Sequence, residues 1–259
     1  MGKILAVINQ KGGVGKSTTA EAVSAGLHMQ GKKVLSIDLD AQANFTYTMA
    51  AESEGTTILE VLMNQAGIRQ AVQATPDGDM VPASQALAGA DAFIRDTGKE
   101  YRLKEALEEI RAEYDFIILD TPPALGILTI NALTACDGVI IPAQADIYSL
   151  QGIEQLAETM KPVKKYCNPY LKIEGILLTR YSPRSILSRE VAEMAEQLAG
   201  KLDTKLFHTS IREAVAVREA QISRQNLFSY APKSKVAQDY LEFIGELLQN
   251  LEEKENIHE

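Results

Sequence analysis

A glycine-rich run followed by a lysine and hydroxyl side chains lies near the start of the chain, in residues 9–19 (NQKGGVGKSTT). A short apolar run typical of a strand precedes it, and a helix-like pattern follows it. Glycines let the backbone curl so that successive N–H groups point at phosphate oxygens, and the helix start beneath adds positive potential. Lys16 can then reach the terminal phosphates of a nucleotide, and the Ser17 hydroxyl can bind Mg²⁺. The alternative is a purely structural glycine turn. The expected phosphate-binding residues are Lys11, Gly12, Gly13, Val14, Gly15, Lys16, Ser17 and Thr18.

Three aspartates close two further strand-like runs. Asp38 and Asp40 end the run in residues 33–40, and Asp120 follows the apolar residues 116–119. Because side chains alternate along a strand, Asp38 and Asp40 share a face and can reach one cluster of metal and water. An acidic residue after a buried strand beside a phosphate loop is typical of a Mg²⁺ site. We therefore expect Ser17, Asp38 and Asp120 to support the metal. The alternative for Asp38 and Asp40 is a turn and a helix cap.

The elements around these motifs alternate between strands and helices. Strands are expected at residues 3–9, 33–39, 116–119, 138–142 and 173–178, and helices at 16–30, 100–113, 148–166, 185–199 and 234–251. This alternation predicts an α/β fold with a mainly parallel sheet and helices on both faces. The loops after parallel strands share one edge, where such folds bind ligands. We expect a single domain over residues 1–259, without an N-terminal helix-turn-helix that would read an operator.

The composition is that of an ordinary globular protein, with 46% apolar and 24% charged residues. No apolar run approaches the ~18–20 residues needed to span a bilayer, and the N-terminus does not resemble a signal peptide. Two cysteines, Cys136 and Cys167, are too few for a disulfide framework. We therefore expect a cytoplasmic protein in a reducing compartment.

The net charge of −9 is unevenly distributed. Residues 161–235 carry 14 basic and 7 acidic side chains, whereas both flanking segments are acidic. A basic segment inside an acidic chain can form a local surface for a polyanion, or it can be a solvated face without a partner.

The motif KGGVGKST resembles the deviant Walker A motif of the ParA/MinD ATPase family, in which an additional lysine occupies the place of Lys11. The segments SIDLDAQAN and DTPP resemble two further motifs of that family. The resemblance implies an α/β P-loop NTPase fold with a mainly parallel, twisted sheet of about seven or eight strands. It further implies binding of ATP and Mg²⁺, with Asp38 supporting the water shell of the metal, and an ATP-dependent homodimer with two nucleotides between the chains. It also implies that Lys11 reaches the partner's nucleotide and that Asp40 positions the attacking water. The implied catalytic residues are Lys11, Lys16 and Asp40.

Two later segments resemble the ParA/Soj partition ATPases in particular, namely residues 148–152 (YSLQG) and 230–235 (YAPKSK). Residues 210–221 depart from the corresponding family segment at both of its arginine positions. The resemblance implies adenine contacts by Thr179, Arg180 and Pro232. It further implies slow hydrolysis stimulated by a ParB-like centromere-binding protein, and non-specific binding of double-stranded DNA on the face opposite the nucleotides, hence nucleoid association. The candidate DNA contacts are Arg184, Arg189, Arg212, Arg218, Arg224, Lys233 and Lys235.

Two alternatives remain open within this family, and the cysteines argue against a third. A MinD-like ATPase would bind membranes through a basic C-terminal helix, but residues 239–255 are amphipathic and acidic, so no membrane partner is expected. A ParA-like ATPase could instead position a protein cargo on the nucleoid. An iron-protein relative would need two thiolates at the dimer axis, and neither cysteine lies in a glycine-flanked loop.

Overall fold

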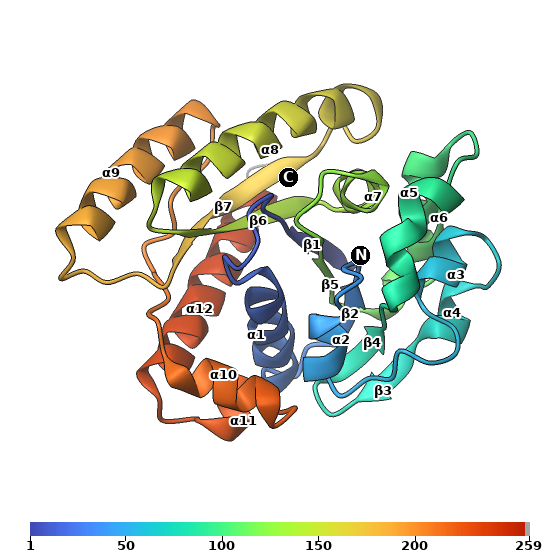
Figure 1. Ribbon diagram of the computed structural model, residues 1–259, viewed down its shortest axis with the longest axis horizontal. Coiled ribbons are helices and arrows are strands. Elements are labelled where there is room, and N and C mark those ends of the chain that lie inside the picture. The colour runs from blue at the N-terminus through green and yellow to red at the C-terminus, as the bar shows by residue number, and fades with distance from the viewer. Residues whose placement is uncertain (257–259) are drawn as a thin grey trace.

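A single seven-stranded sheet forms the centre of the molecule (Figure 1), as a computed structural model describes it for residues 1–256. Its strand order is β3-β4-β2-β5-β1-β6-β7, and every neighbouring pair is parallel except β3 and β4. The expected mainly parallel α/β fold is therefore confirmed. The strands are β1 (Lys3–Val7), β2 (Val34–Asp38), β3 (Gln73–Thr75), β4 (Gly78–Val81), β5 (Phe116–Asp120), β6 (Gly138–Gln144) and β7 (Lys172–Thr179).

Helices cover both faces of this sheet, because its strands are apolar on both sides. Along β1, the side chains of Ile4 and Ala6 belong to one buried cluster, whereas those of Leu5 and Val7 belong to the other. The first cluster includes residues of α3 and α6–α9, and the second includes residues of α1, α2, α11 and α12. The helices are α1 (Lys16–Met29), α2 (Asn44–Thr48), α3 (Ile58–Leu62), α4 (Ile68–Ala71), α5 (Ala90–Phe93), α6 (Arg102–Glu108), α7 (Ile127–Ala135), α8 (Ile147–Tyr166), α9 (Ile186–Lys201), α10 (Val215–Ile222), α11 (Leu227–Tyr230) and α12 (Lys235–Asn256).

The long C-terminal helix α12 packs on the sheet rather than standing free. Tyr240, Phe243 and Leu247 are buried in the second cluster, and Phe207 meets Phe243 edge to face with ring centroids 4.9 Å apart. The apolar face of this acidic helix is therefore covered by other residues of the same chain. None of the helices in residues 1–256 is long and apolar enough to cross a membrane.

Three elements differ from the sequence expectations. The short antiparallel pair β3–β4 extends one edge of the sheet in a region expected to hold only short helices. Helix α7 is the next element after β5, where no helix was predicted, because eight of its nine residues are buried and its apolar residues show no helical periodicity. The helix expected at residues 100–113 is interrupted, with α6 between two 3₁₀ turns (Lys99–Tyr101 and Arg111–Glu113).

The carboxyl ends of the central strands bring the predicted motifs together. Asp120 at the end of β5 lies in register with Val7 of β1 on one side and with Asp38 of β2 on the other. The phosphate loop begins two residues after Val7, and α1 begins at Lys16. One edge of the sheet therefore positions the glycine-rich loop and both strand-end aspartates.

Candidate nucleotide-binding site

The glycine-rich loop borders a cavity of about 700 Å³. Gly13 and Gly15 have φ angles of 76° and 90°, in the left-handed region that favours glycine, and Gly15 is also the N-cap of α1. The loop thus leads directly into a helix N-terminus, the arrangement that favours bound anions. The cavity is lined by Gly12, Gly13, Gly15, Lys16, Ser17, Thr18, Asp40, Gln42, Asn44, Tyr47, Thr48, Pro123, Arg180, Gln221 and Ile222.

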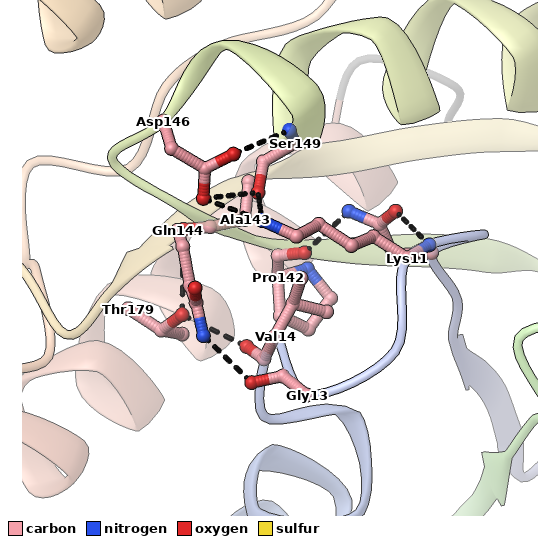
Figure 2. A network of polar contacts seen from close by, with 10 residues as sticks. Lys11, Gly13, Val14, Pro142, Ala143, Gln144, Asp146, Ser149 and Thr179 are labelled. Carbon is pink, nitrogen blue, oxygen red and sulfur yellow. Dashed lines mark hydrogen bonds and ion pairs between the residues drawn. The ribbon is translucent and has the colours of Figure 1, made fainter.

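The loop is held in place by side chains from β6 and β7 (Figure 2). Gln144 Nε2 donates a hydrogen bond to the Gly13 carbonyl at 2.7 Å, and Thr179 Oγ1 donates to the Val14 carbonyl at 2.8 Å. Both interactions turn loop carbonyls toward the protein, which leaves the N–H groups on the other side of the chain available to a ligand. Thr179, predicted as an adenine contact, therefore supports the loop itself.

Lys11 is bound within its own chain, away from the cavity. Its Nζ lies 2.6 Å from Asp146 Oδ2 and 3.4 Å from Ser149 Oγ, at the N-terminus of α8 (Figure 2). Asp146 is also the N-cap of α8, because it accepts a hydrogen bond from the Ser149 N–H. The cationic side chain that distinguishes this loop from an ordinary phosphate loop is thus tied to a helix 135 residues away in sequence.

Lys16 and Asp120 form the buried ionic centre of the site. Lys16 is 7% exposed, and its Nζ donates to the Lys11 carbonyl at 3.1 Å. Burial lowers the pKa of Lys16, although Asp120 and Asp40 oppose that shift. Burial and the neighbouring Asp38 carboxylate raise the pKa of Asp120 well above its usual range, while Ser17 and Lys16 counteract part of the rise.

Both carboxylate oxygens of Asp120 are buried without a hydrogen bond of good geometry to any described residue. A desolvated carboxylate without partners is costly unless a cation or ordered water completes its surroundings. The adjacent Ser17 hydroxyl supplies a second oxygen of the type that Mg²⁺ prefers. The residues present therefore fit a hydrated divalent cation, although residues 1–256 contain no cluster of three or more His, Cys, Asp or Glu side chains that would hold a metal alone.

The structure separates the roles of Asp38 and Asp40. Asp38 is fully buried, and its oxygens accept hydrogen bonds from the Asp40 N–H, the Thr46 N–H and the Thr46 hydroxyl at 2.8–2.9 Å. Burial raises the pKa of Asp38 to about 6, and these hydrogen bonds oppose the shift. Asp40 instead lines the cavity, with its Oδ1 bound to the Gln42 N–H at 3.0 Å. Asp38 thus anchors the loop that presents Asp40.

A second, smaller pocket of about 90 Å³ continues from the main cavity and shares Gly15, Thr18, Arg180 and Gln221 with it. Its lining includes the predicted residues Val14, Thr179 and Arg180. Pro232, also predicted to contact the base, is exposed and lines neither pocket, so the structure does not support that assignment. Gln221, which the sequence analysis did not assign, donates to Thr18 Oγ1 at 3.0 Å.

The predicted DNA-contacting cations are not equivalent in the structure. Arg212 forms a two-pronged ion pair with the buried Asp239, and Arg224 stacks over the Tyr47 ring at 4.9 Å. Arg212 and Arg218 also line the second pocket, beside the phosphate loop. Within residues 1–256, no acidic side chain forms an ion pair with Arg184, Arg189, Arg218, Lys233 or Lys235.

The cysteines lie far from this chemistry. Both are free thiols, and Cys136 and Cys167 precede the amino ends of β6 and β7, at the opposite edge of the sheet from the phosphate loop. Burial raises the pKa of the Cys136 thiol, which disfavours a metal-binding thiolate.

This fold and this loop define a P-loop nucleotide-binding protein of the type that carries a second lysine. A family model described as an AAA domain matches residues 2–173. The sporulation initiation inhibitor protein Soj of Bacillus subtilis is 40% identical, with 96% of this chain and 100% of that protein covered. The chromosome partitioning protein ParA of Myxococcus xanthus is 37% identical, with 96% and 88% covered. The chain belongs to the ParA/Soj family of chromosome partitioning proteins.

A solved structure has the same overall fold. It is described as cobyrinic acid a,c-diamide synthase from Mycobacterium smegmatis with bound ADP and magnesium, and it is 34% identical to this chain. The TM-score is 0.84, with 97% of this chain and 96% of the other covered.

Proposed function

We propose that this chain is a partition ATPase that binds ATP with Mg²⁺, forms a nucleotide-dependent homodimer on non-specific DNA, and leaves the DNA after hydrolysis. The observation that carries the proposal is the pair of lysines in one phosphate loop. Lys16 lines the chain's own cavity, whereas Lys11 is held outside that cavity by Asp146. A site with one lysine at its own cavity and a second lysine outside that cavity suits a reaction that a second chain completes.

The nucleotide's phosphates are bound by the backbone of residues 12–18 and by Lys16. Lys16 exchanges its bond to the Lys11 carbonyl for a phosphate oxygen, a charge-assisted contact that is stronger than the one it replaces. Ser17 and Asp120 hold the metal, and Asp38 acts through the loop that it anchors. The metal supplies charge neutralisation at the phosphates.

Asp40 is the residue that positions the attacking water. It lines the cavity near Lys16 and is fixed by the hydrogen bond from Gln42, while Asp38 holds its backbone N–H. A carboxylate so fixed orients a water and accepts its proton late in a loose phosphoryl transfer. Hydrolysis is slow until a second chain supplies Lys11 and a ParB-like partner favours the productive arrangement.

DNA binding is assigned to the exposed cations without acidic partners, with Arg184, Arg218, Lys233 and Lys235 foremost. Binding through phosphates is independent of sequence and decreases steeply with salt, because counterions are released. Arg212 contributes less to this surface, since Asp239 neutralises its charge.

The experiment that tests the proposal measures mass in solution together with nucleotide turnover. Light scattering should give a monomer without nucleotide and with ADP, and a dimer with ATP and Mg²⁺. Lys16→Ala should lose both ATP binding and dimerisation while keeping the native circular dichroism spectrum. A wild-type protein that stays monomeric with ATP and Mg²⁺ would overturn the proposed mechanism.

A further inference from the structure

The backbone of Lys11 is fixed by a buried side chain that no part of the proposed chemistry uses. Asn9 follows β1 and is 0% exposed. Its Oδ1 accepts a hydrogen bond from the Lys11 N–H at 3.0 Å, and its Nδ2 donates to the Pro142 carbonyl in β6 at 2.7 Å. Asn9 therefore connects the backbone of Lys11 to the strand that leads into α8.

Helix α8 packs against this asparagine without any side chain between them. A Cβ atom added to Gly152 would lie 3.0 Å from Asn9 Oδ1, 3.8 Å from the Lys11 nitrogen and 3.9 Å from Lys11 Cβ. A contact of 3.0 Å is tighter than ordinary packing, so either the helix or the asparagine would have to shift. The glycine thus permits the close approach of α8 to the start of the loop.

The same helix holds the other end of Lys11, because its N-cap Asp146 binds Nζ. Ser149, fully buried one turn before Gly152, contacts both Nζ and Asp146. The distance between Lys11 and Asp146 is therefore set by how closely the backbone of α8 approaches Asn9.

We infer that Asn9 and Gly152 are positioning residues for Lys11, with Asn9 fixing its backbone and Gly152 setting the distance between α8 and the loop. Neither residue touches the reacting atoms. In the proposed function, on which this part of the inference rests, Lys11 acts on the partner's nucleotide. Displacing Lys11 should therefore lower the rate of ATP hydrolysis. The chain's own ATP is held by residues 12–18, whose supports Gln144 and Thr179 are separate from this contact.

The first test replaces Gly152 by alanine and uses Gly200→Ala in α9 as the matched control, since a Cβ at Gly200 meets no atom within 4 Å. We expect Gly152→Ala to lower kcat for ATP by about tenfold, the scale for a misplaced catalytic group, with KM changed less than about twofold. Gly200→Ala should leave both constants unchanged. A Gly152→Ala variant with wild-type kcat, or with a raised KM and unchanged kcat, would overturn the inference.

A double-mutant cycle then asks whether Gly152 acts through Asn9. Asn9→Ala removes the atom that the added methyl group would meet. Gly152→Ala should therefore cause little further loss of kcat in the Asn9→Ala background, whereas it causes a loss of about tenfold alone. Multiplicative losses in the double variant would show that the two residues act separately and would contradict the inference.

A third measurement does not depend on catalysis. Acetylation of the nucleotide-free protein with a limiting amine-reactive reagent, followed by mass spectrometry, reports the accessibility of Lys11 Nζ. Gly152→Ala and Asn9→Ala should each raise labelling of Lys11 several-fold relative to Lys161, because the contact with Asp146 is disturbed. Unchanged labelling would refute the positioning role. A wild-type protein that neither dimerises nor hydrolyses ATP would refute only the proposed function, since the labelling result would still decide the positioning role.

Discussion

Lys11 and Asp146 form an ion pair of 2.6 Å between the phosphate loop and the N-cap of α8. Each side chain is less than one-third exposed, so the pair is partly shielded from solvent. Partial burial would raise the pKa of Asp146, but the hydrogen bond and charge of the Lys11 ammonium, together with hydrogen bonds from the Ser149 N–H and hydroxyl, hold it below its usual value. The Lys11 ammonium is thus bound to Asp146 of its own chain. In the proposed mechanism, it must leave Asp146 before it can reach the partner's nucleotide.

The first prediction concerns this release. Asp146→Asn keeps the N-cap, because asparagine caps as well as aspartate, but it removes the charge that binds Lys11. A partly exposed pair is worth about 1 kcal/mol, so the ATP concentration at half-maximal dimerisation should decrease about fivefold. Glu158→Gln in the same helix is the control, because it breaks an exposed Lys161 pair of the same length. An equal shift in both variants, as measured by light scattering, would show that the pair does not restrain dimerisation.

The second prediction concerns the unpartnered carboxylate of Asp120. Asp120→Asn should abolish Mg²⁺-dependent hydrolysis, with a loss of about 100-fold or more. It should also raise the melting temperature of the nucleotide-free protein, because it replaces a buried carboxylate that lies near the Asp38 carboxylate and has no hydrogen bond of good geometry to a described residue. Calorimetry and a turnover assay on the same preparation measure both effects. Retained hydrolysis together with a lower melting temperature would contradict the assigned role.

The third prediction concerns Asp40. Asp40→Ala should bind ATP and dimerise, yet hydrolyse at least about 100-fold more slowly, so the dimer persists on DNA. Because Asp38 is saturated by hydrogen bonds from Asp40 and Thr46, Asp38→Ala should instead destabilise the fold. Chemical denaturation separates these two outcomes. Hydrolysis by Asp40→Ala at the wild-type rate would show that another residue positions the water.

The fourth prediction concerns pH and stability, and it involves Glu21 of α1. Burial and the nearby Asp77 raise the pKa of Glu21 to about 8, opposed by a hydrogen bond from the Leu227 backbone. The native protein therefore binds a proton that the unfolded chain has lost above pH 4.5, and the free energy of unfolding decreases as the pH rises from about 4.5 to 8.

Glu21→Gln should remove this dependence. The variant should gain stability relative to wild type on going from pH 5 to pH 8.5, by on the order of a few kcal/mol. Urea unfolding at the two pH values measures the difference, and Glu54→Gln at an exposed loop position controls for the loss of one charge. A gain of equal size at both pH values would mean that Glu21 is ionised in the native state.

Much of this architecture could be predicted from local sequence patterns. The apolar runs ending in Asp38 and Asp120 predicted two buried strands, because a strand covered on both faces of a sheet is a nearly continuous apolar run. The structure shows that these two strands are neighbours. The pair β3–β4 was missed because strands of three and four residues carry too little alternation to be recognised.

The contacts made by the site residues could not be predicted from such local patterns. The contacts of Lys11 with Asp146, and of Gly152 with Asn9, join segments more than 130 residues apart, so they depend on how α8 is seated on the sheet. Likewise, nothing in the spacing indicated that Asp239 would neutralise Arg212, or that Pro232 would line neither pocket.

The central claim is that ATP converts this chain into a dimer that binds DNA without regard to sequence. The most direct test measures binding of a fluorescent random-sequence duplex without nucleotide, with ADP, and with ATP and Mg²⁺, at 50 and at 200 mM salt. We predict binding only with ATP and Mg²⁺, weakened by about a hundredfold or more at the higher salt if several phosphates are contacted. Absence of binding in every state, or binding that is independent of nucleotide, would contradict the partition mechanism.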